Sequence, residues 1–184
     1  MKVQVIYSSL SGCTRRLAEG IFAGLDGVDK TLHDLKDGAP ALDGDILLLG
    51  YWVDKGGPNE QMKQFMQGIA GKTVGVFCTL AYYADSTHAH KSVLSGAELL
   101  QAQGNTVLGS YVCNGALSQA MIDRFRRAPA GGPHSATPEN EIRWALLKDH
   151  PTAADIALAQ ERFAERIALY ARLTEASLPY KSIV

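Results

Sequence analysis

The chain has 184 residues, of which 46% are hydrophobic and 20% are charged, and its formal net charge is −1. This length predicts one domain, residues 1–184, with a single core. The nearly balanced charge argues against nucleic acid or an acidic membrane as a partner. No apolar run is long enough for a membrane-spanning segment, so we expect no membrane span.

The first predicted strand, residues 2–7, leads directly into a hydroxyl-rich loop and then into a helix. Ser9, Ser11 and Thr14 supply hydroxyl donors, and Gly12 lets the backbone approach a ligand closely. The free N–H groups of the loop and of the helix N-terminus favour an anion. The lysine of a nucleotide-triphosphate loop and the three-glycine dinucleotide spacing are both missing. We therefore expect a metal-free monophosphate site, with an ordinary strand-to-helix turn as the alternative.

Helices and strands then alternate along the chain. In order, the sequence predicts a helix at 14–25, an edge strand at 29–35, a strand at 46–50, a loop at 51–58, a helix at 59–69, a strand at 73–79, a loop at 80–88, a helix at 89–103 and a strand at 106–113. The segment 46–50 has no polar alternation, which is typical of a central parallel strand covered on both faces. We expect Asn59 to cap the helix that it begins.

The alternation changes after Gly115. We predict a short amphipathic helix, then a flexible Pro-, Gly- and Ala-rich excursion, then a small helical piece; these occupy 117–127, 128–138 and 139–147. The last helix begins near Pro151, and Thr152 and Asp155 have the spacing of a capping box. Residues 116–150 are therefore interpreted as an irregular, partly helical insertion before the last helix.

Five strands that alternate with helices predict an α/β fold with a doubly wound parallel sheet and helices on both faces. In the strand order 2-1-3-4-5, the loops at 8–14, 51–58 and 80–87 meet at one edge of the sheet. Ligands of such sheets bind at the carboxyl ends of the strands, where the strand order reverses. Trp52 from the second loop and Tyr82 or Tyr83 from the third are flat surfaces able to hold a planar ring beside the phosphate.

These three loops resemble those of the flavodoxin family. The stretch Ser9-Leu10-Ser11-Gly12-Cys13-Thr14 is similar to the family's phosphate loop, and Trp52 and the Tyr82/Tyr83 pair stand where its two flavin-flanking loops should be. The resemblance covers residues 2–114 and the final helix, and it implies a flavodoxin-like fold that binds FMN. It implies the following cofactor-binding residues: Ser9, Leu10, Ser11, Gly12, Cys13, Thr14, Tyr51, Trp52, Val53, Asp54, Lys55, Gly56, Thr79, Leu80, Ala81, Tyr82, Tyr83, Asp85 and Ser86.

Several of these positions keep a second interpretation. Trp52 is either a flavin-flanking or a packing residue, and of the two tyrosines we favour Tyr82 as the one that stacks. Asp85 and Ser86 either contact the polar edge of the ring or only shape the turn. Cys13 replaces the asparagine usual in the family, but we expect FMN binding to survive because backbone amides make most of the phosphate contacts.

The resemblance implies single-electron transfer between redox partner proteins, a reductase donor and an acceptor enzyme. An FMN-dependent NAD(P)H oxidoreductase acting on a quinone or another small acceptor is the alternative, since one fold serves both. The insertion at 116–150 favours that alternative because it is able to shape a substrate pocket. A third hypothesis is a non-redox binding domain that has lost its flavin. Three cysteines in strand or strand-end positions suggest reduced thiols and a cytoplasmic protein. We expect a monomer or a weak dimer and no metal site.

Overall fold

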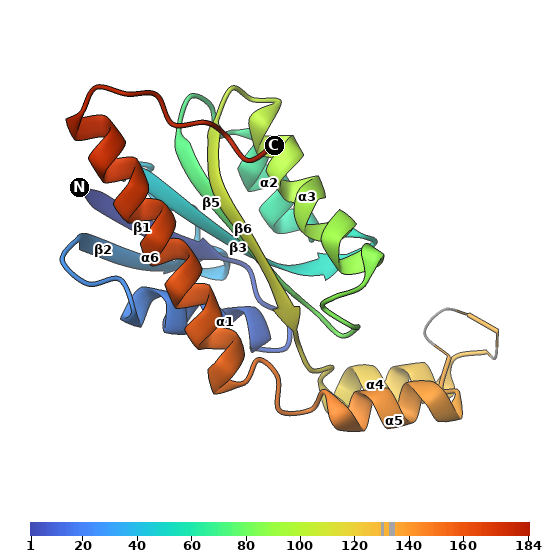
Figure 1. The fold of residues 1–184 in the computed structure, drawn as a ribbon. Coiled ribbons are helices and arrows are strands. Elements are labelled where there is room, and N and C mark those ends of the chain that lie inside the picture. The colour runs from blue at the N-terminus through green and yellow to red at the C-terminus, as the bar shows by residue number, and fades with distance from the viewer. Residues whose placement is uncertain (130, 133–134) are drawn as a thin grey trace.

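The computed structural model describes residues 1–129, 131–132 and 135–184. A parallel sheet lies between two layers of helices, and a pair of helices extends beyond one end of the sheet (Figure 1). The elements are β1 (Lys2–Tyr7), α1 (Cys13–Ala23), β2 (Asp29–Asp34), the 3₁₀ turn η1 (Leu35–Asp37), β3 (Ile46–Asp54), β4 (Gly57–Pro58), α2 (Glu60–Gln67), β5 (Thr73–Leu80), α3 (Thr87–Gln101), β6 (Thr106–Asn114), α4 (Gln119–Arg127), α5 (Pro138–Leu146) and α6 (Ala153–Glu175).

The strand order is the predicted one. The five parallel strands follow the path β2-β1-β3-β5-β6, and the two-residue β4 pairs antiparallel with β3 outside this path. In the register, Tyr7 of β1 lies beside Gly50 of β3, and Gly50 lies beside Phe77 of β5. The carboxyl ends of β1, β3 and β5 are therefore neighbours, which places the three loops that follow them at one edge of the sheet.

Two cores cover the two faces of the sheet. Leu48 packs on the side of α1 and α6, together with Phe77 and Phe163. Its neighbours Leu47 and Leu49 pack on the opposite side, under α2 and α3. All three leucines have no exposed surface, which explains why this strand shows no polar alternation.

The loop predicted at 51–58 is wrong, because the structure forms a β-hairpin there. β3 continues to Asp54 and turns back into β4, with Val53 paired to Pro58. Lys55 and Gly56 make the turn with positive φ angles of 49° and 81°, a combination found in two-residue hairpin turns. Two glycines and a proline close together predict a loop when only neighbouring residues are considered. Pairing with the long β3 makes a strand of Gly57 and Pro58.

The two predicted helix caps have different outcomes. Thr152 and Asp155 form the predicted capping box at the start of α6. Asn59 stands at the cap position of α2, but its side chain makes no capping hydrogen bond. Its Nδ2 instead donates to Ser8 Oγ at 2.9 Å, so this amide connects the start of α2 to the loop after β1.

Residues after α6 return to the sheet. The backbone N–H of Ile183 donates to Val107 O at 3.1 Å, and the Tyr180 hydroxyl donates to Leu108 O at 2.9 Å. This tail, absent from the sequence predictions, covers the open edge of β6. Of the excursion predicted at 128–138, residues 130, 133 and 134 lie outside the described residues. Within the described ranges, no helix is both long and apolar enough to cross a membrane.

Candidate functional site

The loop between β1 and α1 leads into a helix whose cap residue, Gly12, has no side chain to cap it. Gly12 occupies the cap position in the left-handed conformation, with φ 89°, which a glycine adopts at low cost. Ser9 Oγ accepts from Arg15 N at 3.2 Å, so it satisfies one of the first four amides of the helix. Backbone N–H groups at the start of a helix, without a capping oxygen, are suited to an anion.

Cys13 and Thr14 attach this loop to the rest of the carboxyl edge. Cys13 Sγ accepts a hydrogen bond from Ala116 N at 3.2 Å and lies 3.4 Å from His150 O, to which its thiol donates. Thr14 Oγ1 lies 2.9 Å from Thr79 Oγ1 at the end of β5. The Cys13 side chain therefore holds two segments of the insertion beside the loop. The comparison with the asparagine usual at this position in the family did not predict this role.

The hairpin after β3 forms the second side of the site. Trp52, Val53, Asp54, Lys55 and Gly56 line a cavity of about 1220 Å³ at the carboxyl edge. Their predicted placement at the site therefore agrees with the geometry, although they belong to a hairpin and not to a loop.

Tyr51, also predicted as a cofactor residue, points away from this cavity. It is completely buried under α3, and its hydroxyl donates to Ser92 O at 2.7 Å. Burial raises the pKa of Tyr51 well above the ordinary phenol value. Its side chain is a core residue because side chains alternate along β3, so that neighbours in sequence face opposite sides.

The segment after β5 forms the third side. Thr79, Leu80, Ala81 and Tyr82 line the cavity, whereas Tyr83 does not. The tyrosine rings meet at an angle of 60° with their centroids 5.1 Å apart. This geometry supports Tyr82 as the residue that faces a ligand.

Asp85 and Ser86 do not line the cavity either. Ser86 caps α3, since its Oγ accepts from Ala89 N at 3.1 Å and donates to Tyr83 O at 2.7 Å. These contacts agree with the interpretation that Ser86 shapes the turn before α3. Ser9, Gly12 and Thr14 also lie outside the cavity lining; Ser9 and Gly12 belong to the loop before α1, and Thr14 to the first turn of the helix.

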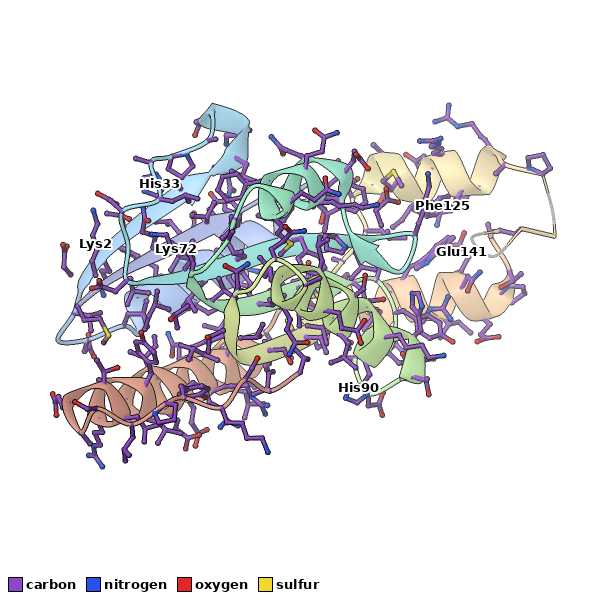
Figure 2. All side chains as sticks on the ribbon, turned by 90° about the horizontal axis from the view of Figure 1, so that it is seen from above. Lys2, His33, Lys72, His90, Phe125 and Glu141 are labelled. Carbon is purple, nitrogen blue, oxygen red and sulfur yellow. The ribbon has the colours of Figure 1, made fainter. Side chains whose placement is uncertain are left out.

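The insertion forms the fourth side of the cavity, although none of the predicted cofactor-binding residues lies in it. α4 and α5 lie side by side beyond the carboxyl end of β6 (Figures 1 and 2). In Figure 2, Phe125 and Glu141 mark this helix pair, at the end of the molecule opposite Lys2 and Lys72. Residues of the pair and its flanks that line the cavity are Leu117, Ser118, Met121, Arg124, Phe125, Ala128, Pro129, Gly132, Ser135, Asn140, Arg143 and Trp144. The spacing of Met121 and Phe125 was a sequence signal for these two residues, because residues four apart on a helix share one face.

Contacts between the two helices keep the pair together. Arg126 Nε and one terminal nitrogen donate to the two carboxylate oxygens of Glu141, at 2.7 and 2.6 Å. This bidentate hydrogen bonding holds the pKa of the Glu141 carboxyl below its usual range. The Phe125 and Trp144 rings pack with their centroids 5.8 Å apart. The pair therefore presents an apolar aromatic surface to the cavity, and its ion pair lies outside the cavity lining.

Two further cysteines belong to the core and not to the site. Cys78 and Cys113 are buried and unpaired. Burial raises the pKa of both thiols, which keeps them protonated and unreactive at neutral pH. The interpretation of these two residues as small buried hydrophobes agrees with this environment.

The donor set fits a flavin mononucleotide. The start of α1, whose cap residue Gly12 has no side chain, and the hydroxyl-rich loop suit a phosphate, and Trp52 and Tyr82 from separate segments suit a flat ring. Gly12 gives the loop an open approach, because a Cβ added there would meet no atom within 4 Å.

Comparisons with known proteins agree with this geometry. A family model for the flavodoxin domain (Flavodoxin_3) matches residues 4–164. The flavodoxin-like domain-containing protein BilS of Clostridioides difficile is 28% identical over 154 residues, covering 82% of this chain and 84% of that protein. BilS of Clostridium symbiosum is 25% identical over 179 residues, covering 87% of this chain and 93% of that protein.

Solved structures share the fold at low sequence identity. A flavodoxin from Streptococcus pneumoniae superposes with a TM-score of 0.60 at 15% identity, covering 92% of this chain and 99% of that one. Fusobacterium nucleatum flavodoxin, solved with flavin mononucleotide bound, gives 0.57 at 14% identity, covering 93% and 97%. Because the family model spans most of the sequence and the sheet order is that of the fold, the chain belongs to the flavodoxin family.

Proposed function

We propose that this protein binds FMN at the carboxyl edge of its sheet and shuttles single electrons between redox partner proteins. The observation that carries the proposal is the convergence of three distant segments on one cavity, with anion-binding groups at one end and aromatic rings from two other segments. FMN supplies the redox chemistry when bound, while the protein supplies binding and electrostatics. Membership of the flavodoxin family supports a redox flavoprotein.

In this proposal, different residues of the chain bind the phosphate and the ring. The amides at the start of α1 and the hydroxyls of Ser9 and Ser11 hold the phosphate, while Trp52 and Tyr82 position the ring and exclude water from it. Tyr82 has 37% of its surface exposed, so the ring edge stays within reach of a docking partner. Reduced, buried cysteines are in keeping with a cytoplasmic protein, and we expect a monomer or a weak dimer.

The proposal is tested with purified protein. Mass spectrometry of the released cofactor should identify FMN, and the reduced protein should pass electrons to a one-electron acceptor protein such as cytochrome c. Absence of FMN binding by the refolded apoprotein at micromolar concentration would contradict the assignment. Reduction by NAD(P)H without any added reductase would instead favour the second candidate.

That second candidate is an FMN-dependent NAD(P)H oxidoreductase acting on a quinone or another small acceptor. The observation in its favour is the α4–α5 pair, which adds an apolar and cationic side to the cavity through Phe125, Trp144 and Arg143. Steady oxidation of NAD(P)H in the presence of a soluble quinone distinguishes this enzyme from a carrier.

The Lys55→Gln variant should have a more negative second one-electron potential than the wild type. Lys55 lies at the turn of the β3–β4 hairpin and lines the cavity, so its charge favours the anionic, fully reduced flavin. The expected shift is at most about 40 mV, because an exposed charge contributes up to about 1 kcal/mol. Stepwise reductive titration measures it, and a potential that is unchanged or higher would exclude this role for Lys55.

A further inference from the structure

We propose that the part of the cavity bounded by α5 is a second binding subsite, in which Arg143 holds the anionic group of a flat aromatic molecule. This rests on the proposed FMN binding, and it deepens the second candidate function by giving the chemical class of a small molecule that binds beside the flavin. The residues concerned belong to the insertion and not to the three strand-end segments.

The size of the cavity is the first argument. Its volume of about 1220 Å³ exceeds the roughly 300–1,000 Å³ that is usual for a pocket holding one small ligand. The described residues that line the cavity extend from Ser11, beside the start of α1, to Arg143 on α5. The cavity therefore has room for a molecule in addition to one cofactor.

The state of the Arg143 side chain is the second argument. Its guanidinium is always charged, yet only 9% of the side-chain surface is exposed, and no described residue accepts a hydrogen bond from its buried Nε. Within the described part of the chain, Arg143 has an ion pair with Glu139, which lies 3.5 Å away with 78% of its own side chain exposed, where water weakens the attraction. A buried cation whose described ion-pair partner is exposed to water favours an anion supplied by a ligand.

Arg143 is held in place before any ligand arrives. One terminal nitrogen donates to Asn140 Oδ1, and Asn140 is itself fixed by donating to Ser135 O at 2.7 Å. The guanidinium carbon lies 4.7 Å from the centroid of the Tyr82 ring and 5.7 Å from that of Tyr83. An arginine stacked on aromatic rings keeps its planar donors directed at a ligand at little cost in conformational entropy.

The surroundings define the rest of the ligand. Met121, Phe125 and Trp144 line this part of the cavity, and the Phe125 and Trp144 rings are inclined by only 34° to each other. Such an apolar, aromatic wall beside one cation suits a flat conjugated body that carries a carboxylate or a sulfonate.

Isothermal titration calorimetry of the FMN-loaded protein tests the subsite with two probes of the same shape. Anthraquinone-2-sulfonate carries the anion, and 2-(hydroxymethyl)anthraquinone does not. The wild type should bind the sulfonate about tenfold more tightly than the neutral probe, since a hydrogen bond to a charged group contributes at least that factor. Arg143→Gln should remove this preference and leave binding of the neutral probe within about twofold.

Two variants make the result specific. Arg127→Gln is the matched control, because Arg127 is exposed on α4, donates to Asp123 O and does not line the cavity; it should keep the preference. Arg143→Lys retains the charge but not the planar fork, so part of the preference should remain, and it covers the case in which Arg143→Gln fails to fold.

Three results would overturn the proposal: unchanged sulfonate binding by Arg143→Gln, equal loss of both probes by a folded Arg143→Gln, or loss of FMN affinity in that variant with the probe preference intact. The last result would assign Arg143 to the cofactor. If the wild type bound no FMN, the proposed function would fail, while the same titrations on the cofactor-free protein would still test the subsite.

Discussion

Replacing Tyr82 with alanine should weaken FMN binding about tenfold to a hundredfold. Tyr82 lines the cavity at the end of β5, and stacking of a flat ring on an aromatic side chain contributes roughly 1–3 kcal/mol. Arg143 covers one face of the Tyr82 ring, so the flavin would stack on the other. Fluorescence titration of the apoprotein with FMN measures the dissociation constant, and Tyr82→Phe should retain most of the affinity because it keeps the ring.

Tyr83→Ala is the matched control for this prediction. Tyr83 is adjacent in sequence and 45% exposed, but it does not line the cavity. Its replacement should change the FMN dissociation constant by no more than about twofold. A larger loss for Tyr83→Ala than for Tyr82→Ala would mean that Tyr83 is the stacking residue.

The Phe163→Ala variant should lose about 3–5 kcal/mol of unfolding free energy. Phe163 on α6 is completely buried and meets the Phe77 ring edge-on, with the centroids 6.2 Å apart. A Cβ added at Gly75 would lie 2.9 Å from the Phe163 ring, so the sheet packs closely against this ring. Removing the ring therefore leaves a cavity that the neighbours cannot fill. Urea denaturation followed by circular dichroism measures the loss.

Leu158→Ala on the same helix serves as the comparison. Leu158 is 56% exposed, so its truncation removes little buried surface and should change the unfolding free energy by less than about 0.5 kcal/mol. Similar losses for the two variants would mean that α6 is not packed on the sheet through Phe163.

Local patterns in the sequence were sufficient to predict the alternation of strands and helices and the start of the site. The uninterrupted apolar run at 46–50 identifies a strand covered on both faces, and the structure buries it completely. Thr152 and Asp155 form their capping box because such a box depends only on residues three apart. Ser9 to Gly12 form the loop before α1 for the same reason, since turn chemistry acts over a few neighbouring residues.

Other features depend on contacts between segments that are distant in the chain. Pairing with β3 makes a strand of Gly57 and Pro58, and Ser8 takes the Asn59 side chain away from its helix cap. Sequence periodicity indicates that α4 is amphipathic, but not which surface its apolar side faces.

The sequence by itself therefore determined the alternating sheet and the loop that suits a phosphate, because periodicity and turn chemistry are local properties of the chain. Only the tertiary structure decided that Tyr51 is a core residue and that Arg143 lies over Tyr82 at the cavity. Both depend on how α3 and the α4–α5 pair pack, and packing partners far apart in sequence leave no signal in the spacing of residues.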